Sequence, residues 1–389
     1  MNVLLLVVDS LRSCSLRLDG EAAGPRTPFL ARLARESIRF RRAYATECWT
    51  LPSHCSMFTG LLPSQHGAHF QTMEYAGGQR TVAEILAAAG FRTGLVTRNS
   101  IFDGSLRGIT RGFQSNVLAL SERRGMNPLN IMLALSKPRF RRQILTSGFF
   151  HPAQRASREF VRTFARAVVP ADREALGRVL DDMREHRARR EPYFIFSNLY
   201  DVHAPYCPSE TSWVRPLRDP RTWHETMRMP VVLTKLGGHV YLQERFSMAP
   251  VSRRMLLGRY HSAIELMDSK LEEFFAHAER DGLLDDTLVV LVSDHGEGFG
   301  EHDLFLHDAS VFDTHLHVPL FVRLPKRRAE TIDDVVSTRD LFGLLCAAVH
   351  DGDTSRTLLD PGYRAARPIA MAEHFHLSLI HISEPTRPY

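Results

Sequence analysis

The stretches LLLVVDS (Leu4–Ser10) and LVVLVSDHGE (Leu288–Glu297) decide the expected fold of this chain. Each stretch is a continuous apolar run that ends in an acidic residue, Asp9 in the first and Asp294 in the second. Runs of this kind are typical of strands that are buried on both faces, as in a parallel sheet. A carboxylate directly after such a strand lies at the carboxyl edge of the sheet, where open α/β proteins bind ligands. The two stretches therefore predict a ligand site built from residues far apart in the sequence.

The rest of the chain alternates apolar strand patterns with helix patterns, which predicts a doubly wound α/β fold. The sheet is expected to be central and mostly parallel, with helices on both faces. Further strands are expected at residues 91–97, 193–199 and 318–323. Helices are expected at residues 28–37, 51–58, 81–89, 171–188, 254–280 and 338–349, with Thr27 and Thr81 as N-caps. Two segments, about 105–190 and 208–250, break the alternation and are expected to be insertions.

The composition is that of a globular chain with a mild basic excess. The 389 residues, of which 44% are hydrophobic and 24% charged, suffice for one large α/β domain or two medium ones. The formal net charge is +5, and much of the excess lies in Arg-rich stretches at 139–142 and 184–190. These stretches indicate a solvated helix face, or alternatively an anionic substrate or a membrane surface. No helix-groove or zinc-finger pattern supports a nucleic-acid partner.

The cysteine pattern and the apolar segments bear on the expected cellular location. Five scattered cysteines without a CxxC pair indicate reduced thiols and no disulfide framework. The start of the chain lacks the pattern of a signal peptide, and no apolar stretch approaches the roughly 18 residues of a membrane span. The cytoplasm is therefore the expected location, without a membrane span.

Asp294 and His295 are adjacent candidate metal ligands after a strand, and Gly296 permits a turn that lets both reach one ion. Aspartate oxygen with histidine nitrogen suits zinc or manganese, whereas aspartate oxygen alone suits calcium or magnesium. A surface turn is the alternative, because Asp, His and Gly all tolerate turns. The equivalent position of Asp9 at another strand end favours the metal site.

Thr50 is the candidate nucleophile. Pro52 fits the first turn of a helix, which places Thr50 at or just before the helix N-terminus, where backbone N–H groups favour an anion. A divalent ion can activate the hydroxyl by binding its oxygen. The alternative is an ordinary helix N-cap, which threonine often supplies without any chemistry.

Several histidines lie close to expected strand ends. His203, two residues after Asp201, could bind a substrate oxyanion or protonate a leaving oxygen, or be neutral and satisfied by backbone. The loop and strand that follow residue 300 contain more histidines than one small ion needs, and His307 is the better functional candidate among them: His302, His307, His315 and His317.

Together these segments resemble the sulfatase-like branch of the alkaline phosphatase superfamily, in the family's order and over about residues 2–345. The resemblance implies an alkaline-phosphatase-like fold and a metal-dependent hydrolase or transferase of sulfate or phosphate esters, with a covalent enzyme intermediate. The matching pieces are VVDSLR (7–12), TLPSH (50–54), FTG (58–60), YDVHAPY (200–206), SDHGE (293–297), GEH (300–302) and HVPL (317–320).

The departures from the family's pattern favour phosphate-directed members. Sulfatases proper carry a Cys or Ser that is oxidised to formylglycine where this chain has Thr50, so no formylglycine is expected. His54 replaces an Arg, Ser10 replaces a second acidic ligand, and His295 stands where typical sulfatases have Asn. His307 falls where many members place a substrate-binding Lys. A threonine with Asp-His is more similar to phosphodiesterases, phosphonate monoester hydrolases and phosphoglycerol or phosphoethanolamine transferases.

The resemblance implies one divalent ion (Mn, Ca, Mg or Zn) and an anionic small-molecule ester as substrate. The expected metal ligands are Asp9, Ser10, Thr50, Asp294 and His295. The expected catalytic residues are Thr50, His203 and His307, and the expected substrate-binding residues are His54, Asp201 and His302. A second ion is an open alternative, held by Asp201, His203 and one of His307, His315 or His317.

Other functions stay open at this point. They are a phosphotransferase or phosphosugar mutase, a catalytically inactive binding protein, and an arylsulfatase that works without formylglycine. The sequence does not indicate the natural substrate or the oligomeric state.

The last part of the chain departs from the family. Residues 1–345 are expected to form the catalytic domain, and residues 346–376 the start of a truncated C-terminal part, so that most of the small C-terminal subdomain is absent. Residues 377–389 resemble the translation of a sequencing adapter and are expected to be a non-native tail, with a genuine polar tail as the alternative.

Overall fold

A computed structural model describes residues 1–19, 24–69, 72, 74–102, 108–118, 172–204, 206, 250–307, 310–350 and 352–375. At its centre is an eight-stranded sheet in the order β10-β2-β9-β6-β1-β5-β3-β4. β9 runs antiparallel to both of its neighbours, and all the other pairs are parallel. The strands are β1 (Asn2–Val8), β2 (Ile38–Tyr44), β3 (Arg92–Thr97), β4 (Ser115–Leu118), β5 (Tyr193–Leu199), β6 (Thr287–Val292), β9 (His317–Arg323) and β10 (Glu330–Ser337).

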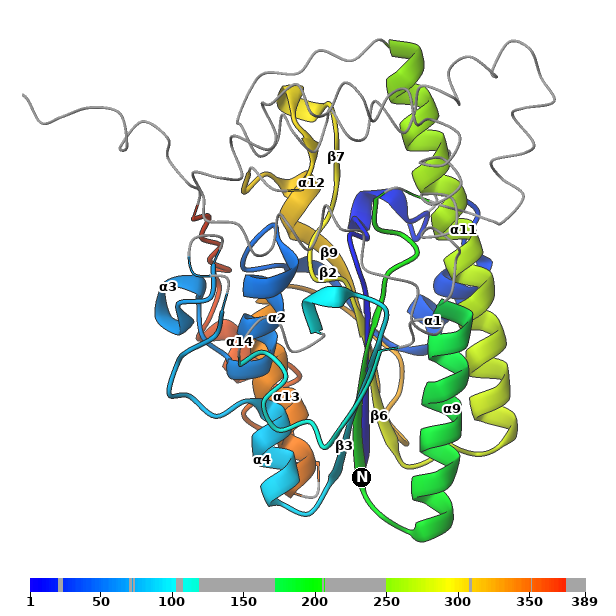
Figure 1. Cartoon of the computed structure of the whole chain (residues 1–389), viewed down its shortest axis with the longest axis vertical. Coiled ribbons are helices and arrows are strands. Elements are labelled where there is room, and N and C mark those ends of the chain that lie inside the picture. Colours follow the sequence, from blue (N-terminus) through cyan, green and yellow to red (C-terminus); the bar gives the residue numbers. More distant parts are fainter. Residues whose placement is uncertain are drawn as a thin grey trace, which may run out of the picture.

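Helices cover both faces of this sheet, which gives three layers (Figure 1). One face carries α1 (Pro28–Glu36), α9 (Asp172–Arg189) and α11 (Pro250–Arg280). The other face carries α2 (Thr50–Thr59), α4 (Val82–Ala88) and α13 (Leu341–Cys346), together with the short helices α3 (Pro63–His66) and α14 (Pro361–Ala365). The expected α/β fold with a mostly parallel sheet is confirmed.

β1 shows why the sheet is covered on both faces. Its side chains alternate between two apolar cores: Leu4, Leu6 and Val8 pack toward α1, α9 and α11. Val3, Leu5 and Val7 point the other way, into the core with α2, α4 and α13. All six side chains are fully buried. A strand can be apolar at every position only when both of its faces are covered.

Capping by a threonine side chain, expected from the sequence, is confirmed at Thr81 and is wrong at Thr27. Thr81 caps α4 by accepting the Glu84 N–H, while the Glu84 carboxylate accepts the Thr81 N–H, which forms a capping box. Gly60 ends α2 in the left-handed conformation (φ 73°). Thr27 occupies the N-cap position of α1 but makes no capping hydrogen bond. Asp268 of α11 instead accepts the first N–H groups of α1, from Phe29 (3.1 Å) and Leu30 (2.7 Å).

Three strands of the central sheet, β2, β4 and β10, were not expected from the sequence. β2 and β10 carry several charged side chains on an exposed face, where Arg41 pairs with Asp333. A register shift between Phe40 and Ala43 of β2 also interrupts the alternation of buried and exposed side chains, so the sequence lacks the two-residue period of a strand. β4 is a short strand at the edge of the sheet.

Parts of the first expected insertion belong to the described layers. Within the segment 105–190, β4 extends the sheet and α9 packs on it. Residues 119–171, nearly all of the second expected insertion, and the expected tail at 377–389 lie outside the described residues.

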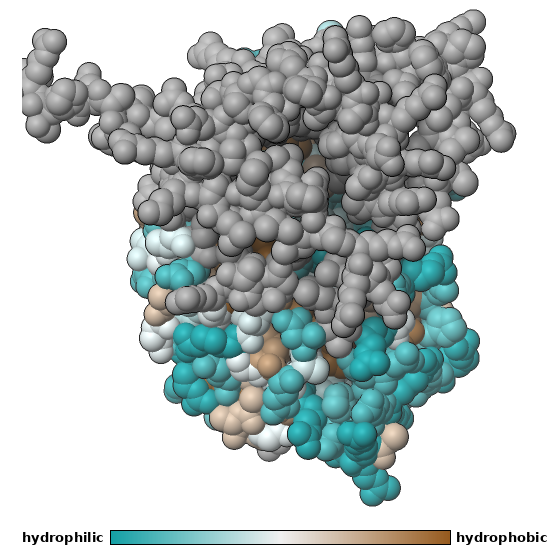
Figure 2. Space-filling model, viewed as in Figure 1, coloured by the Kyte–Doolittle hydropathy of each residue, from teal (hydrophilic) through white to brown (hydrophobic). Residues whose placement is uncertain are grey.

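The described surface in the view of Figure 2 is mainly hydrophilic, and its larger apolar side chains are scattered. Among the described residues, no helix has the length and apolar character needed to cross a membrane.

His66 provides a pH-dependent contribution to stability. The buried ring accepts the Ala68 N–H at Nδ1 (3.0 Å) and contacts Ser56 Oγ through Nε2 (3.1 Å). Burial lowers its pKa from 6.5 to about 4. Because the unfolded chain binds a proton between these values and the folded chain does not, stability must fall as the pH drops from 6.5 towards 4.

When the pH is lowered from 7 to 5, we expect the free energy of unfolding to fall by about 2 kcal/mol because of His66. Urea denaturation of the His66→Gln variant should therefore show a shallower loss of stability over this range. His350→Gln, at an exposed histidine, is the control and should keep the wild-type slope. Equal slopes for His66→Gln and the wild type would contradict this assignment.

Candidate active site

The two aspartates that follow apolar strands come together at the carboxyl edge of the sheet. β1 and β6 are hydrogen-bonded neighbours in a register that pairs Val7 with Val292. Asp9 and Asp294 therefore emerge from adjacent strands, and both side chains are fully buried. Thr50, the first residue of α2, approaches the same point from the helix layer. Residues from distant parts of the sequence thus lie close together at this edge.

The side chains in this group lie within coordination range of one ion. One donor atom each from Asp9, Asp294 and His295 lies within 4.8 Å of the other two. His295 Nε2 is 3.4 Å from Asp294 Oδ2 and 3.8 Å from Asp9 Oδ1. The Thr50 hydroxyl lies 3.3 Å from the same nitrogen. Oxygen and imidazole donors in this combination suit a divalent cation.

The electrostatics of the two carboxylates also favour a cation between them. Burial and the negative charge of Asp9 raise the pKa of Asp294 well above its ordinary value. Burial acts in the same direction on Asp9, but the neighbouring histidines outweigh it and lower the Asp9 pKa. Asp294 Oδ2 is buried and has no hydrogen-bond donor among the described residues. Two such carboxylates can both be ionised only when a positive charge compensates them.

His295 presents a lone pair to this group. Its Nδ1 lies 2.9 Å from the carbonyl oxygen of Gly296, which can only accept, so Nδ1 carries the proton. Burial, together with the charge of His307, lowers the pKa of His295 well below its ordinary value, so the ring is neutral. Its Nε2 therefore faces Asp9, Asp294 and Thr50 without a proton, as a metal-binding imidazole requires.

Asparagine side chains orient Asp9, and the sequence had not suggested them. Asn99, just after β3, and Asn198, near the end of β5, both donate to Asp9 Oδ2, at 3.1 Å and 3.3 Å. Ser10 Oγ donates to Asp9 Oδ1 at 2.9 Å. Ser10, expected as a ligand, thus fixes the neighbouring carboxylate. Polar residues at the ends of β3 and β5 were the available clue, because β5 is next to β1 in the sheet and β3 is next to β5.

The loops that follow β1 and β6 are tied to each other. Ser293 Oγ lies 2.7 Å from the Val8 carbonyl oxygen and accepts the Leu11 N–H at 2.9 Å. Ser10 has a left-handed backbone (φ 62°), which is unusual for a residue with a side chain. Its N–H donates to Asp294 Oδ1, and its carbonyl accepts the Tyr260 hydroxyl at 2.8 Å. These contacts hold the strained turn that directs Asp9.

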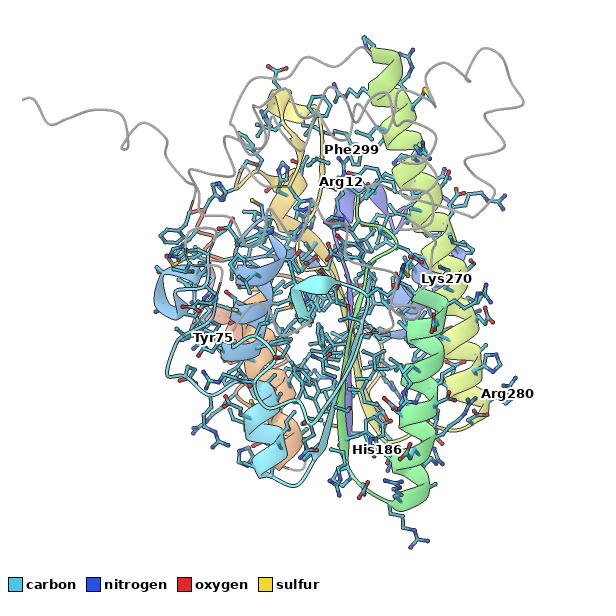
Figure 3. All side chains as sticks on the ribbon, in the orientation of Figure 1. Arg12, Tyr75, His186, Lys270, Arg280 and Phe299 are labelled. Carbon is cyan, nitrogen blue, oxygen red and sulfur yellow. The ribbon has the colours of Figure 1, made fainter. Side chains whose placement is uncertain are left out.

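Arg12 makes a second connection between the same loops. Its guanidinium donates to the carbonyl oxygen of Glu297 (3.2 Å) and to the carboxylate of Glu301 (3.1 Å). It also lies over the ring of Phe299 at 5.3 Å, and Figure 3 shows the two side chains together near the upper end of the sheet. Arg12 of the first loop thus anchors the segment that begins at Asp294.

Thr50 and His54 lie one helical turn apart at the start of α2. Ser53 Oγ donates to the Asp294 carbonyl oxygen at 2.6 Å, which joins this turn to the ligand loop. His54 Nδ1 donates to the Thr50 carbonyl oxygen (2.8 Å) and lies 3.6 Å from Asp294 Oδ2. Its ring is enclosed by aromatic side chains, and burial lowers its pKa to about 4. The His54 side chain is fully buried, and its expected role in substrate binding stays a prediction.

His203 and His307 line up beside His295. The ring centroids of His295 and His307 are 4.4 Å apart, and those of His307 and His203 are 4.9 Å apart. His307 Nδ1 donates to Glu297 Oε1 at 3.0 Å. Burial would raise the Glu297 pKa, but His307 and a hydrogen bond from Tyr206 (2.6 Å) lower it, which keeps the carboxylate charged. Glu297, given no role from sequence, sets the orientation of His307.

Asp201 contacts basic residues from two parts of the fold, helix α11 and the residue that follows β3. Its carboxylate forms a buried ion pair with Lys270 of α11 and lies 3.7 Å from Arg98. Its N–H donates to Asp172 Oδ2 at 2.6 Å. These contacts hold the turn that carries His203, whose Nδ1 donates to the Ala204 carbonyl oxygen at 2.6 Å. The substrate-binding role expected for Asp201 remains a prediction.

The other three candidate histidines contact groups outside the Asp9–Asp294–His295 group. His302 is exposed and stacks on Phe312, with ring centroids 3.9 Å apart. His315 contacts the Leu306 carbonyl oxygen and Ser310 through its two ring nitrogens, at 2.8 Å and 2.7 Å. His317 contacts the Arg41 carbonyl oxygen at 2.7 Å. Among the described residues, three metal-donor side chains come close enough to share an ion in two places, and neither place includes Asp201 or His203. The geometry therefore gives the second-ion alternative no support.

The fold and this site define a member of the alkaline phosphatase superfamily. A mostly parallel central sheet with helices on both faces is the fold that the resemblance implied. The sulfatase family model matches residues 1–349, and the chain belongs to this family.

Known proteins similar to this chain include a sulfatase and a multifunctional member of the alkaline phosphatase superfamily. Choline-sulfatase of Rhizobium meliloti (strain 1021) is 24% identical over 83% of this chain and 62% of its own length. The multifunctional alkaline phosphatase superfamily protein PehA of Trinickia caryophylli is 24% identical over 78% of this chain and 64% of its own length. The chain therefore spans less than two thirds of each of these relatives.

Solved structures agree on the fold. The phosphonate monoester hydrolase of Agrobacterium radiobacter superposes with a TM-score of 0.62 at 17% identity, covering 95% of this chain and 78% of that one. The phosphonate monoester hydrolase of Silicibacter pomeroyi gives a TM-score of 0.56 at 16% identity, covering 90% and 73%.

Proposed function

We propose that this chain is a metal-dependent hydrolase of anionic esters in which Thr50 is the nucleophile, with phosphodiesters or phosphonate esters favoured over sulfate esters. The observation that carries the proposal is the position of the Thr50 hydroxyl, 3.3 Å from His295 Nε2 and beside Asp9 and Asp294. A serine or cysteine that could become formylglycine does not occupy this position. The chain therefore needs a mechanism in which an unmodified hydroxyl attacks.

The residues present fit a divalent ion bound by Asp9, Asp294 and His295, with Thr50 next to it. Such an ion would supply a Lewis acid and lower the pKa of the Thr50 hydroxyl. The Asn99, Asn198 and Ser10 contacts keep Asp9 in place, and ligands held in this way need less reorganisation. The start of α2 adds backbone N–H groups that favour an anion next to Thr50.

Thr50 Oγ1 gives up its proton to solvent and attacks the phosphorus or sulfur atom in line, and the ester oxygen opposite leaves with the electron pair of the broken bond. His203 and His307 lie in a row beside His295 and would contact the substrate oxygens. Each has Nδ1 fixed by a carbonyl or carboxylate oxygen, so Nε2, in its protonated form, is the atom that gives a proton to the leaving oxygen. Water then cleaves the ester formed on Thr50.

A substrate and metal screen tests this proposal. The metal-free protein is supplied in turn with Mn²⁺, Ca²⁺, Mg²⁺ and Zn²⁺. It is then assayed with bis-p-nitrophenyl phosphate, p-nitrophenyl phenylphosphonate, p-nitrophenyl phosphate and p-nitrophenyl sulfate. We expect metal-dependent release of p-nitrophenol, with the highest kcat/KM for the diester or the phosphonate. Highest activity on the sulfate would overturn the substrate preference, and no turnover with any metal would overturn the function.

A further inference from the structure

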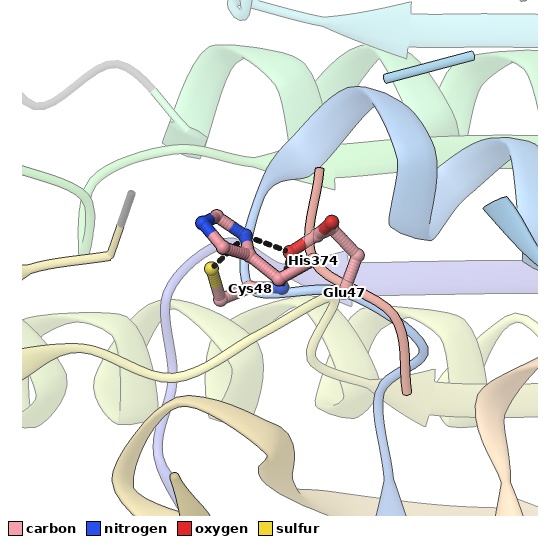
Figure 4. A group of neighbouring side chains, drawn as sticks. All are labelled: Glu47, Cys48 and His374. Atoms are coloured by element: carbon pink, nitrogen blue, oxygen red, sulfur yellow. Dashed lines mark hydrogen bonds and ion pairs between the residues drawn. The ribbon is translucent and has the colours of Figure 1, made fainter. Parts of the chain in front are cut away.

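A second group of metal-binding residue types lies outside the active site. Glu47 and Cys48 are in the loop between β2 and α2, and His374 is in the segment that follows α14. Figure 4 shows the three side chains converging from these two segments. Glu47 and Cys48 are buried, whereas about a fifth of the His374 side chain (21%) is exposed. The group is thus enclosed on the protein side and can be reached from solvent through His374.

The contacts in this group converge on one nitrogen of His374. Nδ1 lies 2.8 Å from Glu47 Oε1 and 3.6 Å from Cys48 Sγ. Thiolate, imidazole and carboxylate are the three protein donors that zinc accepts, at about 2.3, 2.0 and 2.1 Å. In a tetrahedral site these bond lengths place sulfur and nitrogen about 3.5 Å apart and nitrogen and oxygen about 3.3 Å apart. The observed distances therefore need changes of only about half an ångström.

We propose that Glu47, Cys48 and His374 bind a Zn²⁺ ion, with one coordination position open to water or another small ligand. The mixed sulfur, nitrogen and oxygen set distinguishes this site from the Asp9–Asp294–His295 group, which has no sulfur donor. Soft thiolate donors select zinc over magnesium, calcium and manganese. The proposal does not depend on the proposed catalytic function, because no residue is shared between the two groups.

The position of the site gives the ion a structural consequence. The segment around His374 is already attached to this region, since the Glu373 N–H donates to the Thr46 carbonyl oxygen at 2.9 Å. The Glu373 carboxylate also accepts the Ser64 N–H and hydroxyl, at 2.7 Å and 2.8 Å. Zinc at this site would fix the same segment to the loop directly before Thr50. It would therefore limit the movement of the start of α2.

Cobalt substitution tests the site, because thiolate-bound Co²⁺ has a near-ultraviolet charge-transfer absorption that oxygen and nitrogen ligands alone do not give. We expect the metal-free protein to develop this absorption on addition of Co²⁺ and to lose it when Zn²⁺ displaces the cobalt. Cys48→Ser should abolish the absorption, and His374→Gln should weaken cobalt binding at this site at least about tenfold. Cys14→Ser, at an exposed cysteine, is the matched control and should leave the absorption unchanged.

A second comparison separates this site from the active site. Asp294→Asn should lower total cobalt by about one ion per chain while the thiolate absorption remains, and Cys48→Ser should do the reverse. Absence of the thiolate absorption in the wild type would overturn the proposal. So would its persistence in a folded Cys48→Ser protein, or in His374→Gln with unchanged affinity. Circular dichroism of each variant establishes that the fold is kept, and His374→Gln gives the decisive result if Cys48→Ser does not fold.

Discussion

Thr50→Ala is expected to lower kcat on the best substrate of the screen by at least about 10³-fold, because it removes the atom that forms the covalent intermediate. The metal content should stay at the wild-type level, since Asp9, Asp294 and His295 are untouched. The free energy of unfolding should change by no more than about 1 kcal/mol, because the hydroxyl's hydrogen bond among the described residues is a long one, 3.3 Å to His295. Steady-state kinetics, elemental analysis and urea denaturation measure the three quantities.

Thr59→Ala is the matched control for this experiment. Thr59 is a buried threonine at the other end of the same helix, and its hydroxyl donates to the Cys55 carbonyl oxygen at 2.6 Å. Loss of that hydroxyl should leave kcat within about twofold of the wild type. If Thr50→Ala turns over as fast as Thr59→Ala, threonine is not the nucleophile, and the attacking group must be water or another side chain.

The second large effect is expected at Asp294. Asparagine keeps the oxygen that accepts the Ser10 and His295 N–H groups but removes the charge that a cation needs. We expect Asp294→Asn to weaken divalent metal binding more than about 100-fold, and turnover to fall with it. Titration with metal, followed by calorimetry and by activity, measures both changes.

The same substitution should not reduce the stability of the metal-free protein. Burial and repulsion by Asp9 raise the pKa of Asp294, so its ionised carboxylate destabilises the fold when no cation is present. Metal-free Asp294→Asn should therefore be at least as stable as the metal-free wild type at pH 8, and the wild type should gain more stability than the variant when metal is added.

Asp268→Asn is the control for a buried aspartate outside the site. Because Asp268 caps α1, its substitution should reduce stability and leave metal binding intact. If Asp294→Asn retains wild-type metal affinity, the proposed ligand group is wrong.

The sequence predicted the parts of the site that depend on strand order. An apolar run followed by an acidic residue is enough to place Asp9 and Asp294 at one edge of a parallel sheet. The helix start at Thr50 follows from Pro52 in the same way. These features are local, and the topology of a parallel sheet brings them together without further information.

Side-chain directions were beyond the reach of the sequence, because they depend on neighbours that are distant along the chain. The sequence shows that Asp201 is two residues before His203, but it does not show in which direction the Asp201 carboxylate points. That direction depends on its ion pairs with Lys270 and Arg98. The buried position of His54 depends on Phe102 and Phe196 in the same way. β2 and β10 were missed because their charged residues hide the strand alternation.

The central place of β1 has a consequence for the synthesis of this chain. Val3 pairs with Phe194 on one side and with Leu288 on the other. At about 5–20 residues per second, a ribosome needs roughly 15–60 s after making β1 to reach its second partner. Throughout this time the nascent chain carries an apolar strand with an unoccupied edge, which favours aggregation. We therefore expect its yield in cells to depend on chaperones that bind emerging chains, more than the stability of the finished protein would suggest.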